Sequence, residues 1–213
     1  MVITYHGLGL VKVQQGDTVI ALNPIGKDSD IKPVRFGADI ALVSRRAPEW
    51  NGVEEMSFGS KVPFVIEGAG EYEVGGVFVK GFYVEEELDG DKYVNTIYTL
   101  LVDGILICHL GAQKSKVLPE KVTEKIGEID ILFVPVSSRR PDLLTPSDAY
   151  ALTTELQAKL VIPLFVDGEG EDKKALDAFV KSFGSEVKKE DKLTIKKKDL
   201  EGKEGELLVL SQM

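Results

Sequence analysis

Histidine and cysteine are the scarcest chemically reactive residues in this chain. Only His6 and His109 occur among 213 residues, and Cys108 is the single cysteine. One cysteine excludes an internal disulfide framework and every zinc site built from several cysteines. Two histidines exclude any mechanism that needs several imidazoles.

Long apolar runs and an excess of positive charge are also missing. No stretch approaches about 20 apolar residues, and the first residues lack the pattern of a signal peptide. The formal net charge is −9, which opposes sequence-independent binding of nucleic acid, because such binding needs local positive charge. We therefore expect a cytoplasmic protein without nucleic-acid or membrane partners.

The composition is that of a globular protein. Apolar residues make up 43% of the chain and charged residues 29%, which argues against disorder. A chain of this length buries about 70% of its unfolded surface, so it needs neither disulfides nor a metal merely to fold. We predict a single domain over residues 1–213, because no linker, repeat or low-complexity tract interrupts the sequence.

Short β-type runs dominate the first half of the chain. Residues 96–102 and 105–110 flank Asp103-Gly104, and two such runs around Asp-Gly are the strongest short signal for a β-hairpin. The charge-dense residues 85–91 are interpreted as a solvated loop.

Strands alternate with helices in the second half. Thr145 is a predicted helix N-cap, with Asp148 at the third helical position. Residues 172–183 show apolar side chains at helical spacing, whereas the charge-dense residues 188–203 are typical of a solvated edge. Hairpins followed by β-α-β-α indicate a mixed sheet covered by helices.

Several stretches together resemble the metallo-β-lactamase superfamily, and within it the small lactonase-like branch of zinc-dependent hydrolases. The stretches are VITYHGLGLVKVQQGDTVIALNP, ADIALVSRRAPEWNGVEE, GAGEYEVGGVFVKGF, NTIYTLLVDGILICHLGAQ, IDILFVPV and KLVIPLF. The resemblance covers essentially the whole chain. It implies an α+β or α/β fold, a four-layer αβ/βα sandwich of two mixed sheets, with a site on one edge between the sheets.

The metal ligands that the resemblance implies are replaced in this chain. The positions at which the family carries its histidine and aspartate ligands hold Arg45, Ala47, Glu49, Trp50, Glu86, Ala112 and Phe165. Leu8 likewise stands where the first hairpin of the family has a histidine. His109 is retained, but in the family it precedes the bridging aspartate and is not a principal ligand.

The residues that remain suit a catalytic zinc poorly. A hydrolytic zinc needs about three protein donors and an open position for water. Only Glu49 and Glu86 can donate, and two carboxylates without imidazole suit a hard cation at best. We therefore expect no catalytic residue, no metal and no cofactor, and we expect Trp50 and Phe165 to fill the vacated volume.

Four of the five arginines form two adjacent pairs, Arg45-Arg46 and Arg139-Arg140, each directly after an apolar strand. On the fold that the resemblance implies, both pairs border the site. Because a guanidinium suits carboxylate and phosphate, these four residues are candidate anion-binding residues. The alternative, which we weigh more heavily, is that Arg45 and its neighbours pair internally with Glu49 and with the acidic residues 85–87.

The leading functional hypothesis is a catalytically degenerate member of the fold that works as a binding or structural module, with a homo-oligomer as one form. The alternative is a hydrolase of a small phosphorylated or carboxylated substrate with an altered or metal-free site. A third hypothesis, a regulator that senses an anion, uses the same arginines without chemistry. The sequence itself names neither a ligand nor a partner.

Overall fold

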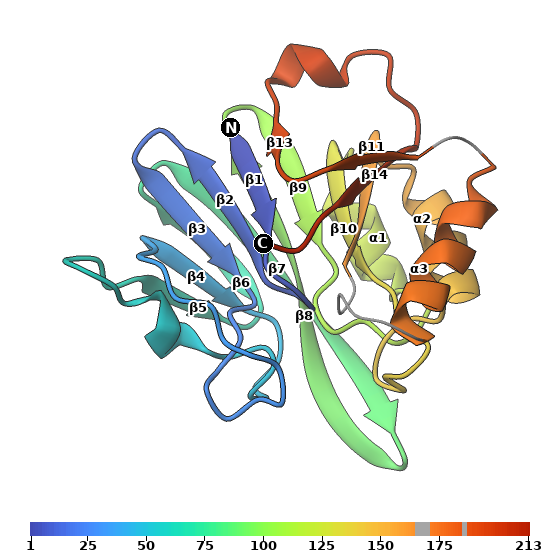
Figure 1. The fold of residues 1–213 in the computed structure, drawn as a ribbon, viewed down its shortest axis with the longest axis horizontal. Coiled ribbons are helices and arrows are strands. Elements are labelled where there is room, and N and C mark those ends of the chain that lie inside the picture. Colours follow the sequence, from blue (N-terminus) through green and yellow to red (C-terminus); the bar gives the residue numbers. More distant parts are fainter. Residues whose placement is uncertain (165–170, 185–186) are drawn as a thin grey trace.

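Two facing β-sheets form the centre of the structure, a computed structural model that describes residues 1–164, 171–184 and 187–213 (Figure 1). Among these residues, the six-stranded sheet has the order β13 (Leu193–Thr194), β1 (Val2–Tyr5), β2 (Val11–Gln15), β3 (Thr18–Leu22), β4 (Ile40–Val43) and β5 (Phe64–Glu67). The eight-stranded sheet has the order β12 (Lys188–Glu190), β14 (Glu206–Leu210), β11 (Leu160–Leu164), β10 (Ile131–Pro135), β9 (Ile105–His109), β8 (Asp91–Val102), β7 (Val77–Leu88) and β6 (Gly70–Val74).

Both sheets are mixed, as predicted. In the first sheet β1, β2 and β3 are antiparallel, whereas β3, β4 and β5 are parallel. In the second sheet β6 to β9 are antiparallel, and β9, β10, β11 and β14 run parallel. Strands β4 and β10 are buried at every residue, because both faces of these central strands are covered.

Alternation of side chains along the strands divides the core into layers. The cluster between the sheets includes Ile3 and Leu42 from the first sheet and Leu100 and Phe133 from the second. Successive side chains of a strand point to opposite faces. The neighbours of these residues therefore pack outward, against the layers that cover the two sheets.

The two outer layers differ in kind. Helices α1 (Glu120–Ile126), α2 (Pro146–Leu156) and α3 (Glu171–Ser182) cover the second sheet, and their buried side chains share one cluster with those of the sheet. The first sheet is covered by residues 23–39 and by the 3-10 helix η1 (Val53–Met56), whose apolar side chains pack against β3 and β4. The predicted layered sandwich is confirmed, with loop and 3-10 helix forming its outer layer on the first sheet. The prediction of a single domain stays a prediction.

Strands β6 to β9 form three consecutive β-hairpins in the middle of the chain, and the predictions from sequence concern the last two. Val102 pairs with Ile105 across the predicted Asp103-Gly104 turn, where both residues have positive φ, 51° and 73°, as a two-residue hairpin turn requires. The interpretation of residues 85–91 as a loop was wrong. Strands β7 and β8 continue through them to a turn at Asp89-Gly90 and project from the body of the molecule (Figure 1).

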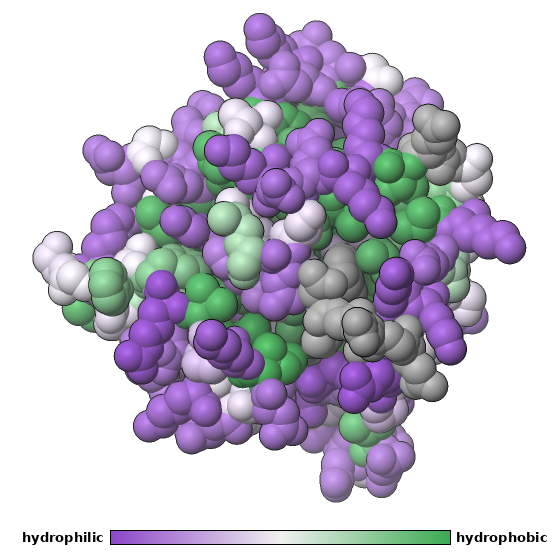
Figure 2. All heavy atoms as spheres, in the orientation of Figure 1, coloured by the Kyte–Doolittle hydropathy of each residue, from purple (hydrophilic) through white to green (hydrophobic). Residues whose placement is uncertain are grey.

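The predicted helices of the second half are present. Thr145 Oγ1 accepts a hydrogen bond from Asp148 N at 3.3 Å, which confirms the N-cap of α2. The charge-dense residues 188–203, predicted to be a solvated edge, contain three short elements: β12, β13 and the 3-10 helix η2 (Lys197–Leu200). In the described part of the chain, no helix is long and apolar enough to span a membrane. The face drawn in Figure 2 is mainly hydrophilic, with apolar side chains in small separate groups.

Candidate functional site

Trp50 fills the corner of the sandwich that follows strand β4. Its side chain is fully buried, 0% exposed, in the cluster that also contains Leu8 and Ala112. The ring packs so closely on Gly9 that a Cβ there would lie 2.3 Å from Trp50 Cζ3. The indole N–H has no hydrogen-bond partner among the described residues. Three positions that the family resemblance assigns to histidine or aspartate therefore share one apolar cluster. Phe165, which we expected to face Trp50, lies outside the described residues.

The other predicted metal-site positions hold few donors. Glu86 is buried, and its Oε1 accepts hydrogen bonds from the backbone N–H groups of Lys114 at 3.0 Å and Ser115 at 3.1 Å. Ala47 and Glu49 are half-buried in the loop after β4. Within the described ranges, no group of three or more His, Cys, Asp and Glu side chains could hold a metal ion. That these positions are the remains of a metal site stays a prediction.

The retained His109 has a structural environment. Its Nε2 lies 3.0 Å from Gly9 O, and its Nδ1 accepts a hydrogen bond from Gly111 N at 2.9 Å. Burial lowers the pKa of His109 to about 4, so the ring is neutral at pH 7 and donates from Nε2. Neighbouring Cys108 belongs to the cluster under the helices, because successive side chains of a strand point to opposite faces. Burial raises the pKa of its thiol.

Arg45 does not pair as we expected. Its Nη1 donates to Asp142 Oδ2 at 2.7 Å, and its guanidinium stacks on Tyr93, with Cζ 3.9 Å from the ring centroid. Arg140 binds the same carboxylate, through Nε to Oδ1 at 3.3 Å and Nη2 to Oδ2 at 3.2 Å. The expectation of an internal ion pair is therefore correct, but the predicted partners, Glu49 and Glu86, are wrong. Backbone amides satisfy Glu86 instead.

Asp142 is the centre of this arginine cluster. Its side chain is only 9% exposed, whereas Arg45 and Arg140 are 20% and 25% exposed. Burial alone raises the pKa of Asp142, but the hydrogen bond from Arg140 and the charges of Arg140 and Arg45 outweigh it and lower the pKa. Two guanidinium groups on one carboxylate give this three-residue cluster a net positive charge.

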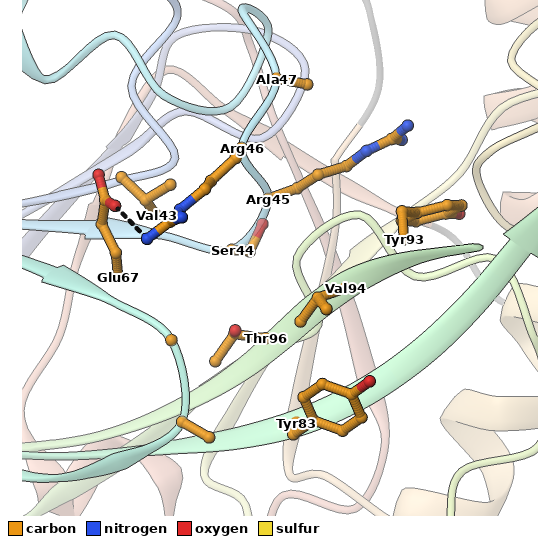
Figure 3. Close-up of a pocket in the computed structure, with 12 residues that line it drawn as sticks. Val43, Ser44, Arg45, Arg46, Ala47, Glu67, Tyr83, Tyr93, Val94 and Thr96 are labelled. Carbon is orange, nitrogen blue, oxygen red and sulfur yellow. Dashed lines mark ion pairs between the residues drawn. The ribbon is translucent and has the colours of Figure 1, made fainter. Parts of the chain in front are cut away.

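Arg46 points away from this cluster. Its Nη2 lies 3.4 Å from Glu67 Oε2, and its side chain is 81% exposed. Arg139 N donates to Ser137 Oγ at 3.1 Å in the loop after β10. The structure thus brings Arg45 and Arg140 together at Asp142. Arg46 points away from Arg45 and forms a separate, loose ion pair with Glu67 (Figure 3).

A pocket of ≈ 540 Å³ opens between the diverging Arg45 and Arg46 (Figure 3). Its lining comes from three places: the loop after β4, the turn between β5 and β6, and the β7–β8 hairpin. Tyr83, Val94 and Thr96 form the hairpin side, with Tyr83 43% and Val94 44% exposed. The pocket therefore combines exposed apolar side chains with guanidinium groups on its rim.

Tyr98 fixes the base of this pocket. From strand β8, its hydroxyl lies 2.8 Å from Val43 O and accepts a hydrogen bond from Gly68 N at 2.8 Å. Nearby, Thr96 N donates to Ser44 O at 2.8 Å. Burial is the main cause that raises the pKa of Tyr98 to about 12, so the hydroxyl keeps its proton. These bonds join the two sheets and hold three lining segments in place.

The sequence did not point to Asp142, Tyr93 or Tyr98. Each residue acts through a partner that is distant in sequence: Arg45 is 97 positions from Asp142, and Tyr98 is 55 positions from Val43. The spacing of residues along the chain contains no signal for such contacts. A general signal was present for Asp142, because an acidic residue follows the Arg139-Arg140 pair directly after one proline.

Comparison with known families gives one assignment. A family model described as a β-lactamase superfamily domain matches residues 2–165 of the chain. A curated protein from Lysinibacillus sphaericus (strain C3-41), named UPF0173 metal-dependent hydrolase, is 26% identical over 202 residues, which cover 77% of this chain and 84% of that protein.

Solved structures share the whole fold. A Thermotoga maritima protein of the metallo-β-lactamase superfamily superposes with a TM-score of 0.75 at 26% identity, covering 99% of each chain. The metallo-β-lactamase fold protein YhfI from Bacillus subtilis superposes with a TM-score of 0.59 at 8% identity, over 99% of this chain and 97% of that one. At 8% identity the second likeness shows the fold alone.

Proposed function

Because the chain belongs to the β-lactamase superfamily, we propose that it is a member that binds a ligand at the family's edge of the sandwich without a catalytic zinc. In this proposal the corner beyond β4 has become part of the hydrophobic core. The neighbouring pocket is what the chain retains of the ligand-binding edge. The chain then works as a binding module and not as a hydrolase.

The burial of Trp50 is the observation that supports this proposal most directly. It stands where the resemblance implies a histidine ligand, and it packs with Leu8 and Ala112 at two further such positions. A buried indole contributes a large apolar area to the core. The ring already lies directly against Gly9, so it has no space to move toward that residue. Opening this corner to a hydrated metal ion would expose that area again.

The chemistry of the remaining donors points in the same direction. Zinc in hydrolases prefers imidazole and carboxylate ligands, with about three of them from the protein. Of the predicted positions that are described, Glu49 and Glu86 alone carry donor groups, and the Glu86 carboxylate already accepts two backbone hydrogen bonds. Arg45 adds a positive charge in the same loop as Glu49. This donor set does not fit a hydrolytic zinc, so we derive no metal-dependent step.

A metal-dependent hydrolase is the competing function, since the relative from Lysinibacillus sphaericus has that name. Metal analysis of protein purified without chelator separates the two functions. We expect far less than one zinc per chain and the same melting temperature with and without EDTA. About one zinc per chain, removed by EDTA with a clear fall in melting temperature, would refute the proposal.

A further inference from the structure

Arginine is concentrated at the edge of the pocket, although the chain as a whole is acidic. The chain carries −9. Among the described residues at this edge, Arg45, Arg46 and Arg140 pair with Asp142 and Glu67, and the charge of the buried Glu86 acts on Tyr93, the ring on which Arg45 stacks. The next acidic group, Glu85, is neutralised by Lys92 at 2.7 Å. The charges at this edge are therefore close to balance, and the exposed guanidinium of Arg46 is the positive group that attracts anions.

Arg46 is the arginine that a ligand can reach and use. The guanidinium of Arg45 is enclosed between Tyr93 and Asp142, so another anion would first have to displace a semi-buried carboxylate. Arg46 is 81% exposed, and its contact with Glu67 at 3.4 Å is long for a charge-assisted hydrogen bond. Because exposed ion pairs are weak, an incoming anion can replace Glu67 as the partner of Arg46.

The rest of the pocket suits an apolar body attached to that anion. Tyr83 and Val94 are large apolar side chains that stay 43% and 44% exposed in the pocket wall. The volume, ≈ 540 Å³, lies in the range of small-molecule sites. The hydroxyl of Tyr98 ties Val43 and Gly68 together below it, so the site is already formed without a ligand.

We infer that this pocket binds a small aromatic anion, with Arg46 holding its carboxylate or phosphate group and Tyr83 packing against its ring. The inference rests on the proposed function, since it assigns a ligand class to the same edge. Arginine takes carboxylate and phosphate in the same two-pronged geometry. Glu67 then acts as an internal competitor that occupies Arg46 while the pocket is empty.

Calorimetric titration of the full chain in EDTA tests the assignment, with phenyl phosphate and benzoate as probes. At least one should bind, and phenol and inorganic phosphate should each bind about tenfold more weakly, since each lacks one of the two contacts. Arg46→Gln should weaken binding about tenfold or more, because it removes a charge-assisted contact. Glu67→Gln should strengthen binding by about threefold, because it removes the competitor.

Two variants sharpen the test. Tyr83→Ala should weaken the binding of the aromatic probes and leave the binding of inorganic phosphate unchanged. Arg35→Gln is the control outside the pocket, because Arg35 is also an exposed arginine in an ion pair, although its partner Glu55 is buried. Absence of binding by the unaltered chain would overturn the inference, as would equal effects of Arg46→Gln and Arg35→Gln, or weaker binding in Glu67→Gln.

The binding titration and the metal analysis can fail independently of each other. Stoichiometric zinc with intact binding in EDTA would refute the proposed function and leave the ligand class standing. Absence of both zinc and binding would support the loss of the metal site and overturn the ligand class. Release of inorganic phosphate from phenyl phosphate only when zinc is added would likewise count against the proposed function alone.

Discussion

The corner filled by Trp50 and the pocket beside it lie in the same loop region, yet they have opposite characters. Trp50 is fully buried in an apolar cluster, whereas Arg46, four residues earlier, is 81% exposed at the rim of a pocket. The loop after β4 therefore contributes to core packing at one end and to a solvent-exposed surface at the other. The effects of substitutions in the buried corner can therefore be measured separately from those in the exposed pocket.

The two carboxylates that face the arginines show the same contrast on a smaller scale. Asp142 is 9% exposed and receives hydrogen bonds from Arg45 and Arg140, whereas Glu67 is 32% exposed and contacts Arg46 at 3.4 Å. A buried ion pair leaves an uncompensated charge when one partner is removed, but an exposed pair does not. Asp142 is thus a structural residue, and Glu67 is replaceable by a ligand.

Removing the indole should have the largest effect on stability. Trp50→Ala leaves a cavity in the cluster with Leu8 and Ala112, and truncation of a buried aromatic residue costs about 3–5 kcal/mol. The free energy of unfolding in urea measures this loss. If the variant lost less than about 1 kcal/mol, Trp50 would not belong to the core, and the corner would be open.

The next effect in size concerns Asp142. Asp142→Ala leaves Arg45 and Arg140 facing each other, and we expect a loss of about 2–3 kcal/mol, below the about 3–5 kcal/mol of fully buried pairs because both guanidiniums are partly exposed. Glu67→Ala serves as the matched variant and should stay within about 0.5 kcal/mol of the unaltered chain. Equal losses in the two variants would remove the distinction between the structural and the replaceable carboxylate.

His109 makes the stability of the protein depend on pH. Burial lowers its pKa from 6.5 to about 4, so the unfolded chain binds a proton more readily. Neutral His109 makes a contribution to the free energy of unfolding that is fully present above about pH 6.5 and is lost as the pH falls toward about 4. Between pH 7.5 and pH 5 this loss is about 2 kcal/mol. His109→Asn should flatten the plot of unfolding free energy against pH over this window.

The residual slope in that variant has an independent cause. Burial, with the charge of Lys12, lowers the pKa of His6 to about 4 as well, so some dependence persists in His109→Asn. A slope identical to that of the unaltered chain would show that the pKa of His109 is the same in the folded and unfolded states, and therefore that the ring is accessible to water.

The smallest effect is expected at Glu49. It is half-buried in the loop after β4, and substitutions outside the core and its polar networks stay within about 0.5 kcal/mol. Glu49→Gln should therefore leave both stability and binding of the aromatic probes unchanged. A loss of zinc from the purified variant relative to the unaltered chain would instead identify Glu49 as a ligand.

Most of the fold could be predicted from the sequence, because strand period and turn chemistry are local signals. The Asp103-Gly104 turn, the Thr145 cap and the strand Ile40–Val43 are each defined within a few residues. The extension of the β7–β8 hairpin was missed because the buried position between Glu85 and Glu87 holds another glutamate, Glu86, although burial alternates along the strand. A run of acidic residues has no apolar alternation to reveal the strand.

The candidate site could be predicted only in part. Four arginines were identified as a group, but the sequence did not show that Arg45 and Arg140 converge on Asp142 while Arg46 faces outward. Which carboxylate an arginine reaches depends on distances between loops of different sheets, which the order of residues does not contain. The wrong partners, Glu49 and Glu86, were selected because they are near in sequence or in the family motif, whereas backbone amides had already satisfied Glu86.

Trp50 fluorescence tests the central claim most directly, because Trp50 is the only tryptophan of the chain. If the corner belongs to the core, emission is blue-shifted, acrylamide quenches it weakly, and addition of zinc to the EDTA-treated protein leaves the spectrum unchanged. Emission that is red-shifted, freely quenched and altered by stoichiometric zinc would contradict the account, because it would place water and a metal ion where the indole is buried.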